Sequence, residues 1–352
     1  MKQGVELIEK LALCFGPTSC EGEVEAAIRE ELAGTGAVLE TDRMGNLTAH
    51  LPGKENCPRI LLSAHMDEVG FMITHIEEKG YLRFDTLGGI DPAVLSGRAV
   101  TLGDESKRVN GVIAAKGIHQ QTAEERKKLP DIDDLYIDIG TSSREETEAL
   151  LCRGDFGTFD TPFCRFGKDG AYIKSKALDD RMGCAVLIEV LRALDGKDLP
   201  LDLWFAFTVR EEIGKSGALV SASRIAPDCA IILETTAIAD VANVDPACRV
   251  ASVGEGGVLS LLDRSTIYDR SLVDFALETG KKRGIPVQVK RYVSGGNDAA
   301  RIQRSGVGVR CLALSAPTRY LHAPVSVASI KDYESMVALV SAMLCDWKEG
   351  SK

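Results

Sequence analysis

The chain has 352 residues, 45% of them hydrophobic and 27% charged, which excludes wholesale disorder and suits two domains or one domain with a large insertion. The formal net charge of −10 and the aromatic content of 5% disfavour nucleic acid as a partner. An acidic chain does not neutralise phosphates, and few aromatic side chains are present to stack on bases. No run of about 18 apolar residues is present to span a membrane, so no membrane partner is expected.

The N-terminal segment, MKQGVELIEKLALCFGP, is amphipathic and lacks the apolar core and cleavage site of a signal peptide. The ten cysteines form no CxxC pair. We therefore expect a cytoplasmic protein with reduced, mostly buried thiols, and no zinc site built from thiolates.

The first third of the chain predicts two helices and then strands. One helix is expected over residues 4–14, and a second is expected to be capped by Thr18 or Ser19 and to reach about Ala33. Residues 37–51 predict a strand, a turn and a second strand. The segment RILLSAHMDE, residues 59–68, is an apolar run that ends in polar residues, which is typical of a buried parallel strand.

Residues 70–166 have a different pattern. Short β-like pieces are separated by Gly and Pro about every eight to twelve residues, which predicts a small sandwich or barrel. One short helix is predicted within residues 142–152, with Ser142 or Ser143 as its cap.

From residue 172 onward, helices and strands alternate again, which predicts an α/β fold. Residues 1–69 and 167–352 would thus form one α/β domain, interrupted by a β-rich insertion at 70–166. The predicted helices cover residues 181–194, 270–284 and 329–349, and the predicted strands cover residues 201–209, 229–236, 287–293 and 308–315.

Histidine and acidic residues gather at the expected ends of these strands. In open α/β sheets, ligand sites lie outside the carboxyl ends of the strands. Two histidines and several carboxylates, with no cysteine, suit zinc, cobalt or manganese, and a set of this size could hold two ions. The residues are His65, Asp67, Asp179, Asp180, Glu211, Glu212, Glu234 and His322.

Each of these positions also has an ordinary structural interpretation. A strand-end histidine is often only a satisfied polar residue, and Asp179 with Asp180 could cap the helix that follows them. Glu211 and Glu212 could be a solvated strand end. Together, however, the five segments that carry these residues favour one shared site over separate structural explanations, because all five lie at predicted strand ends. The segments are 65–67, 179–180, 211–212, Glu234 and His322. The other histidines, at positions 50, 75 and 119, are expected to lie outside it.

Taken in chain order, these segments resemble those of the co-catalytic dinuclear aminopeptidases, the family of glutamyl, deblocking and tetrahedral (TET) aminopeptidases, some of whose members are labelled endoglucanases. The resemblance covers nearly the whole chain and implies a mixed-sheet α/β/α metallopeptidase domain with a β-barrel-like insertion. It rests on the segments GPTSCEGEV, DRMGNL, LLSAHMDEVGFMI, LGGIDPAVLSGRAV, SKALDDRMGC, VREEIGKSGA, ILETTAIADV, SGGNDAARI and APTRYLHAPVSV.

The resemblance also implies roles for individual residues. It implies two divalent metal ions per subunit, with zinc as the first expectation and cobalt or manganese as alternatives, and a cis peptide bond between Asp179 and Asp180. Among the implied ligands, His65 and Glu212 each bind a single ion and Asp179 bridges both ions. Glu234 binds the remaining ion, whose shell His322 completes. Glu211 is the implied general base, and Asp67 is the residue that orients His65.

The implied activity is the release of N-terminal residues from peptides by metal-activated water. The implied assembly is a homo-oligomer, a dodecamer built from dimers, with contacts made by the insertion. Two positions depart from the usual family pattern: Glu234 stands where Asp is common, and SGGNDAA replaces a GGTDAG pattern. The preferred N-terminal residue stays open; an acidic preference would need a cation such as Arg264, Lys290, Arg291 or Arg319.

Three other functions remain as alternatives. A glycoside hydrolase, as in an endoglucanase, would use Glu211 and Glu212 as acid and nucleophile, but neighbouring residues rarely flank one bond and the histidines would have no role. A deacylase or amidase could use the same dinuclear scaffold on a small acylated substrate. A non-catalytic assembly protein could keep the scaffold without the reaction, although every ligand position holds a competent residue.

Overall fold

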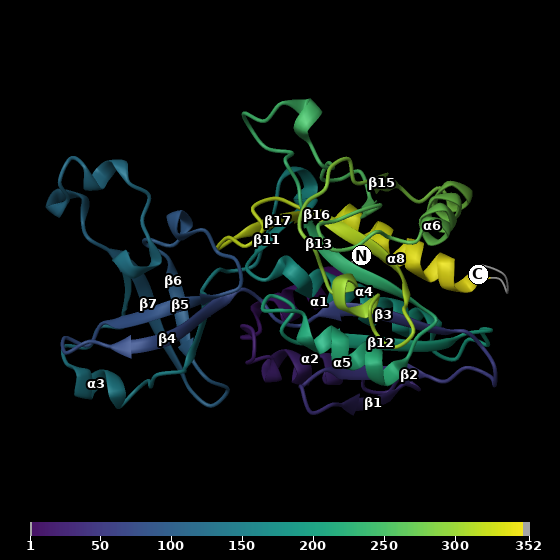
Figure 1. The fold of residues 1–352 in the computed structure, drawn as a ribbon, viewed down its shortest axis with the longest axis horizontal. Coiled ribbons are helices and arrows are strands. Elements are labelled where there is room, and N and C mark those ends of the chain that lie inside the picture. The colour runs from purple at the N-terminus through teal and green to yellow at the C-terminus, as the bar shows by residue number, and fades with distance from the viewer. Residues whose placement is uncertain (1, 348–352) are drawn as a thin grey trace.

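The computed structural model describes residues 2–347, which form an α/β domain and a separate barrel beside it (Figure 1). The α/β domain is built on an eight-stranded mixed sheet whose strand order is β1-β2-β12-β3-β13-β16-β14-β15. The strands are β1 (Val38–Thr41), β2 (Leu47–Leu51), β3 (Arg59–His65), β12 (Asp202–Thr208), β13 (Cys229–Ala237), β14 (Gly257–Leu259), β15 (Val287–Val289) and β16 (Arg310–Thr318).

The four central strands β12, β3, β13 and β16 run parallel to one another. Strand β3 lies between β12 and β13. The chain therefore moves across the sheet in one direction from β3 to β12, and in the opposite direction from β12 to β13. Because parallel crossovers are right-handed, the helices on these two connections cover opposite faces of the sheet. The helices of the α/β domain are α1 (Lys2–Leu13), α2 (Gly22–Leu32), α4 (Leu178–Leu194), α5 (Ser216–Ile225), α6 (Arg270–Arg283), α7 (Ala299–Ile302) and α8 (Ile330–Cys345). Of these, α4 lies between β3 and β12 in the chain, and α5 lies between β12 and β13.

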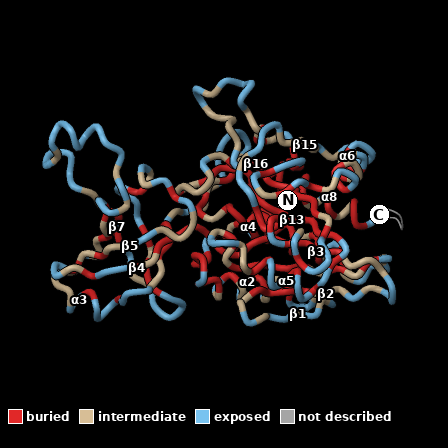
Figure 2. The backbone as a smooth tube through the Cα atoms, in the orientation of Figure 1, coloured by how far each residue is buried: buried red, intermediate tan, exposed pale blue. Residues whose placement is uncertain are grey.

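The main hydrophobic core lies between this sheet and its helices, where Figure 2 shows most of the buried chain. Helix α4 is buried along nearly its whole length and packs against α1, α8 and the central strands. The central strands are apolar on both faces, as strands covered on both sides must be. This rigid core fixes the carboxyl ends of the parallel strands.

The insertion is a closed barrel with its own core. Its strand order is β4-β5-β8-β7-β6-β9, and Phe71 packs edge-on against Phe84 and Phe159 with ring centroids 5.2 and 5.1 Å apart. The strands are β4 (Gly70–Ile76), β5 (Leu82–Leu87), β6 (Ala99–Gly103), β7 (Arg108–Ala115), β8 (Leu135–Asp138) and β9 (Phe156–Phe159); helix α3 (Arg144–Glu148) is capped by Ser143.

A small three-stranded sheet lies where the chain returns from the barrel to the α/β domain (Figure 1). It consists of β10 (Cys164–Phe166), β11 (Tyr172–Ser175) and β17 (Ser326–Ser329). The predicted fold class, a mixed-sheet α/β domain interrupted by a small β-barrel, is confirmed.

Three predicted details differ from the structure. Helix α2 begins at Gly22 with Glu21 at its N-cap and no side-chain cap; the predicted caps Thr18 and Ser19 lie before it, and the Thr18 hydroxyl instead binds Asp67. The predicted strand 287–293 ends at Val289. The predicted closing helix ends at Cys345, and its last two predicted residues, 348 and 349, lie outside the described residues.

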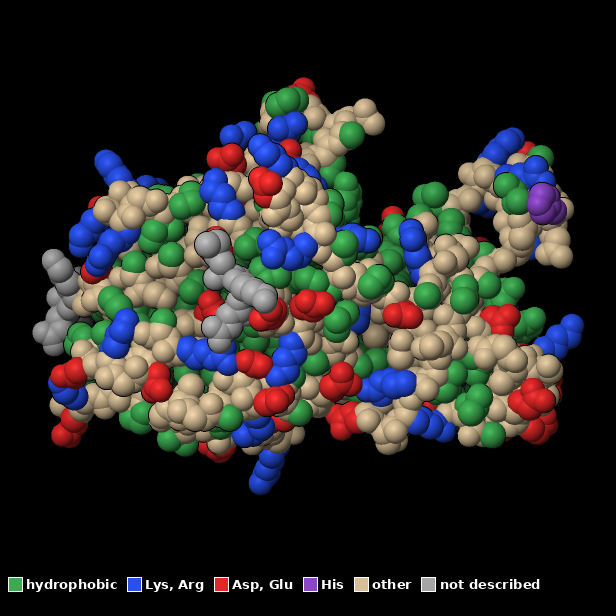
Figure 3. All heavy atoms as spheres, turned by 180° about the vertical axis from the view of Figure 1, so that it is seen from behind, with side chains coloured by type: hydrophobic (Ala, Val, Ile, Leu, Met, Phe, Trp, Pro, Cys, Tyr) green, Lys and Arg blue, Asp and Glu red, His purple; other side chains and the backbone are tan. Residues whose placement is uncertain are grey.

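Among residues 2–347, no helix is long and apolar enough to cross a membrane. The ten cysteines are all free thiols, of which five are buried. On the face shown in Figure 3, acidic and basic side chains are interspersed and form no continuous basic surface.

Candidate metal centre

The acidic and histidine side chains come together at one edge of the main sheet. His65 is the last residue of β3, and Glu211 with Glu212 follows the end of β12. Because these strands are parallel neighbours, their carboxyl ends lie side by side. Glu234 lies within β13, three residues before its end, and it also lies within the strand predicted over residues 229–236.

Asp179 and His322 complete the group from outside the sheet. Asp179 lies in the first turn of α4, where its backbone and that of Asp180 are not helical, and the peptide bond between them is cis. His322 lies in the loop that joins β16 to β17. The N-cap interpretation fits Asp180, whose Oδ1 accepts from the Gly183 amide at 3.0 Å, whereas the Asp179 carboxylate lies against His65 and His322.

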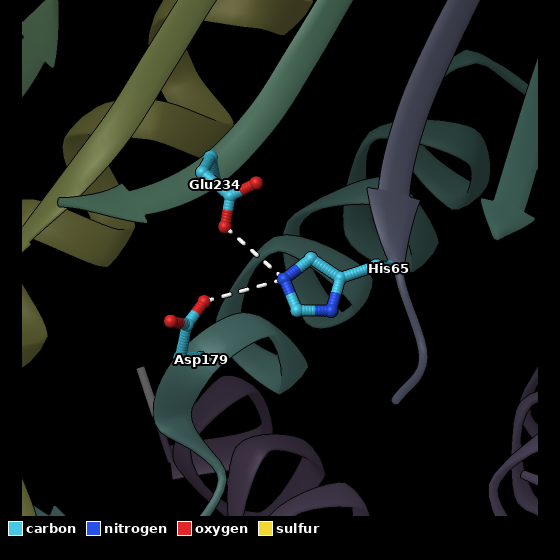
Figure 4. A group of neighbouring side chains, drawn as sticks. All are labelled: His65, Asp179 and Glu234. Atoms are coloured by element: carbon cyan, nitrogen blue, oxygen red, sulfur yellow. Dashed lines mark ion pairs between the residues drawn. The ribbon is translucent and has the colours of Figure 1, made fainter. Parts of the chain in front are cut away.

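The side chains form two groups that share Asp179. In the first, His65 Nε2 lies 3.3 Å from Asp179 Oδ1 and 3.3 Å from Glu234 Oε1 (Figure 4). In the second, His322 Nε2 lies 3.2 Å from Asp179 Oδ2 and 3.3 Å from Glu212 Oε1. Glu234 therefore belongs with His65, and Glu212 belongs with His322, whereas the expected pairing placed Glu234 with His322.

These two groups fit a divalent metal ion. Ligand atoms bound tetrahedrally at about 2.0–2.2 Å from zinc are about 3.3–3.6 Å apart, which is close to the separations between the histidine nitrogens and the carboxylate oxygens. In addition, the buried Asp179 Oδ1 has no hydrogen-bond partner among the described residues. The donors are nitrogen and oxygen only, which suits zinc, cobalt or manganese.

Each histidine is oriented by a backbone carbonyl. His65 Nδ1 lies 3.0 Å from the Asp67 carbonyl oxygen, and His322 Nδ1 lies 2.9 Å from the Gly89 carbonyl oxygen. A proton on Nδ1 satisfies these bonds and leaves Nε2 free to bind a metal. The closer contact of His65 is with the Asp67 backbone, since the Asp67 carboxylate lies 3.5 Å away; the orienting role expected of that carboxylate stays a prediction.

The Asp67 carboxylate mainly holds the turn that carries Glu211 and Glu212. Its Oδ1 accepts from the Glu211 amide at 3.0 Å, and its Oδ2 accepts from the Glu212 amide at 3.2 Å and from the Thr18 hydroxyl at 2.8 Å. Burial alone would raise the pKa of Asp67, but contact with His65 and these donors lowers it. The carboxylate therefore stays ionised although it is fully buried.

Glu211 lies beside the two groups and has a different partner. Its Oε1 is 2.9 Å from the Lys215 ammonium, and burial together with nearby carboxylates raises its pKa well above the usual range. A buried carboxyl with a raised pKa is suited to proton transfer. Lys215 was not among the residues singled out in the sequence, because nothing in the spacing marks it.

The charges of the centre depend on one another. Burial lowers the pKa of His322, but Asp179 and Glu212 outweigh it and raise that pKa to about 11. Burial raises the pKa of Glu234 to about 8, against the attraction of His65. These shifts show a cluster whose carboxylates need positive charge, supplied by protonated histidines when no metal is bound.

A cavity of about 260 Å³ opens onto this centre. Metal-group residues line it together with Glu211 and Lys215 on one side, and with a second, polar wall formed by residues from β16 and from the loops after β14 and β15. Of that wall, the sequence pointed to Lys290 as a possible selecting cation and to the SGGNDAARI segment that carries Asn297; its other residues were not predicted, because they share no motif. The wall includes Ser260, Asp263, Lys290, Asn297 and Ser315.

The other histidines lie outside the centre, as expected. His50 Nε2 bonds Asp202 at 2.7 Å, and its ring stacks on Trp204 with centroids 3.8 Å apart. Neither His75 nor His119 is among the residues that line the cavity.

Histidines and carboxylates gathered beyond parallel strand ends, with a carboxyl group beside them, define a metallohydrolase of the α/β class. The chain belongs to the M42 glutamyl aminopeptidase family, whose model matches residues 45–339.

Three relatives show how close this similarity is. The chain is 33% identical to the lysyl aminopeptidase of Pyrococcus furiosus, over 88% of this chain and 87% of that protein. It is 34% identical to the TET aminopeptidase of a marine sediment Thaumarchaeota archaeon, with a TM-score of 0.95 and coverage of 99% and 98%. It is also 34% identical to the Pyrococcus horikoshii TET1 peptidase, with a TM-score of 0.87 and coverage of 98% and 100%. The protein is thus a metal-dependent aminopeptidase.

Zinc binding to the metal-free protein near pH 7.5 is expected to release protons. The carboxylates hold the pKa of both His65 and His322 above that pH, and an imidazole must lose the Nε2 proton to bind a metal. Zinc affinity should therefore fall as the pH is lowered. Calorimetry in buffers of different ionisation enthalpy measures the number of protons released.

The variant His322→Gln should release fewer protons, and His50→Gln should match the unmodified protein because His50 bonds Asp202 far from the centre. Zinc binding without proton release would contradict the charge assignment.

Proposed function

We propose that this aminopeptidase uses two divalent metal ions, held by His65, Asp179 and Glu234 on one side and by Asp179, Glu212 and His322 on the other. The observation that carries the proposal is Asp179, which presents one carboxylate oxygen to each group. Zinc is the first candidate, with cobalt or manganese as alternatives. When bound, such ions polarise a peptide carbonyl and lower the pKa of water.

Glu211 is the general base in this proposal. Its carboxylate removes a proton from the attacking water and then passes the proton to the leaving amine. Glu211 fits this role because one of its oxygens pairs with Lys215 at 2.9 Å, whereas His65 makes its 3.3 Å contacts with Asp179 and Glu234. The carboxylates of the centre can also attract the free α-ammonium of a substrate, which restricts cleavage to the N-terminal residue.

An acidic N-terminal residue is the substrate that the cavity suits best. Of the four cations considered in the sequence, Lys290 lines the cavity, whereas Arg319 is bound to Asp240 at 2.9 Å and the other two are exposed. Lys290 donates to the Ser294 carbonyl at 2.9 Å. No carboxylate among residues 2–347 lies within ion-pair distance of its ammonium.

Asp263 shares this wall of the cavity but is already bonded. Its Oδ1 accepts from the Ser265 and Thr266 amides at 2.7 Å each, and its Oδ2 accepts from the Tyr268 hydroxyl at 2.5 Å. Lys290 is therefore a half-buried cation that a substrate carboxylate can pair with.

The glycoside hydrolase alternative is not favoured. Glu212 lies against His322 and Glu211 lies against Lys215, so neither is free to act as the acid and nucleophile of a sugar bond. A deacylase or amidase would use the same centre and differs only in the amine or acyl group that the cavity accepts.

We also propose that the chain forms a cytoplasmic homo-oligomer, a dodecamer built from dimers. The Pyrococcus horikoshii TET1 peptidase can assemble into a tetrahedron or a large octahedral shell, and the structure named PhTET1-12s is a dodecamer. The segment between β7 and β8 of the barrel carries large exposed apolar side chains, with Ile118 60% and Leu129 81% exposed. Such residues favour burial against a partner.

The variant Glu211→Gln is expected to lose activity by about 10²–10⁴-fold, because an amide cannot take up the proton. Its metal content should equal that of the unmodified protein, since Glu211 is not one of the proposed ligands. Glu212→Gln is the matched comparison and should lose both activity and metal. Full activity in Glu211→Gln, measured beside metal content, would refute the assignment.

The variant Lys290→Gln is expected to lower kcat/KM for glutamyl p-nitroanilide by about 10- to 100-fold, since a hydrogen bond to a charged group contributes about 1.5–3 kcal/mol. Leucyl and glutaminyl substrates should be affected little. Arg291→Gln, at the exposed neighbouring position, is the control. An unchanged ratio of glutamyl to leucyl hydrolysis in Lys290→Gln would exclude Lys290 as the selecting residue.

The mass of the protein in solution tests the assembly. One chain has a mass of 37.9 kDa, and light scattering is expected to give a particle about twelve times heavier. Replacing Ile118 and Leu129 together by Ser should yield smaller species. A monomer at working concentration would contradict the proposed assembly.

A further inference from the structure

Three successive backbone amides of the turn that carries Glu211 point at buried carboxylates. The Arg210 amide donates to Glu21 Oε1 at 3.3 Å, and the next two amides donate to Asp67 at 3.0 and 3.2 Å. Arg210 has a φ of 58°, a left-handed conformation that lets neighbouring amides converge on one side. The turn is thus an anion-binding nest that the protein fills with its own carboxylates.

Glu21 reaches this nest from the loop that joins α1 to α2. Its side chain is buried, and its Oε1 also accepts from the Ser19 amide at 2.8 Å. Burial and the nearby carboxylate of Asp67 raise the pKa of Glu21 to about 7. Burial of a carboxyl group needs compensating contacts, and the Arg210 amide of the catalytic turn is one of those that Glu21 has.

Thr18 supports the second carboxylate from the same loop. Thr18 is 2% exposed, and its hydroxyl donates to Asp67 Oδ2 at 2.8 Å. Removal of this donor would leave the Asp67 carboxylate held by the two turn amides and by the more distant imidazole of His65.

The loop that carries Thr18 and Glu21 is itself fixed. The Thr18 amide donates to the Glu68 carbonyl at 3.2 Å, and the Glu68 amide donates to the Gly16 carbonyl at 3.0 Å. The fully buried Arg181 also donates to the Gly16 carbonyl, at 3.1 Å. Because the loop is held at these points, its side chains can fix the position of the turn.

We propose that Glu21 and Thr18 are positioning residues for Glu211. They act through the backbone of residues 210–212 and through Asp67, and they touch neither the metal groups nor the cavity. This inference rests on the proposed role of Glu211 as the general base. Since a displacement of about 1 Å can lower a rate about 10²-fold, loss of these contacts should reduce kcat more than substrate binding.

The first test compares Glu21→Ala with Glu21→Gln. Alanine removes the acceptor for the Arg210 amide, and kcat should fall about tenfold, the equivalent of one hydrogen bond of about 1.4 kcal/mol, with KM and metal content unchanged. Glutamine keeps an acceptor oxygen and should stay within about threefold of the unmodified protein.

Glu23→Ala is the matched control. Glu23 lies two residues after Glu21, in the first turn of α2. It accepts from an amide of the same loop, that of Phe15 at 3.1 Å, but it does not touch the turn. Its removal should leave kcat unchanged. Equal losses of kcat in Glu23→Ala and Glu21→Ala would show a general effect on the loop and overturn the proposal.

Thr18→Val and Thr18→Ser provide a second pair if Glu21→Ala does not fold. Valine removes the hydroxyl and should lower kcat severalfold, and serine should restore it. Hydrogen exchange of the peptide that covers residues 209–213 in the metal-free protein gives a readout independent of activity, and it should be faster in Thr18→Val and Glu21→Ala.

Unchanged exchange and unchanged kcat in these variants would overturn the positioning role, even if the unmodified enzyme is fully active. An inactive unmodified enzyme would instead contradict the proposed function. The two failures are therefore distinguishable.

Discussion

The repulsion between carboxylates at one edge of the main sheet is the constraint on which the site depends. Asp179, Glu212 and Glu234 converge within contact distance of two imidazoles, those of His65 and His322. Like charges this close are tolerable only when cations lie between them. The rigid core beneath the parallel strands holds the carboxylates in place, so the charge must be balanced by protons or metal rather than by movement.

Two neighbouring residues connect this edge to the rest of the molecule. After β3 ends, the Asp67 carboxylate turns towards the amides of Glu211 and Glu212. The Glu68 carboxylate turns the other way and accepts from Lys176 at 2.6 Å and from Thr158 of the barrel at 2.7 Å. The chain enters the barrel at Gly70, where a Cβ would lie 2.5 Å from a backbone oxygen. The segment that joins the α/β domain to the barrel is thus held by two buried acids, Asp67 and Glu68.

Much of this arrangement could be predicted from the sequence, because it follows from periodicity. Long apolar runs such as residues 201–209 give buried strands, and the polar residues after them must lie at a common edge. The candidate residues were identified in this way, and their roles as metal ligands come from a family resemblance. They are His65, Asp179, Glu212, Glu234 and His322. The barrel was foreseen only as a barrel or sandwich, since short strands do not specify closure.

Details set by tertiary contacts could not be predicted. Thr18 has the sequence pattern of a helix cap, but its hydroxyl bonds Asp67, which is 49 residues away. The pairing of Glu234 with His65 depends on the strand order, in which β13 lies next to β3. Lys215 lies in the VREEIGKSGA segment and Lys290 is one of the four candidate cations, but only the folded chain shows that both of them line the cavity.

The same geometry explains how adjacent glutamates have separate roles. Both follow one strand, and their amides bond the two oxygens of a single carboxylate, Asp67. With the backbone held in this way, the Glu212 side chain lies against His322 and the Glu211 side chain lies against Lys215. Each acid therefore has its own positive neighbour, which limits their mutual repulsion. The division between ligand and base depends on the backbone of the turn, and hence on the loop that holds it.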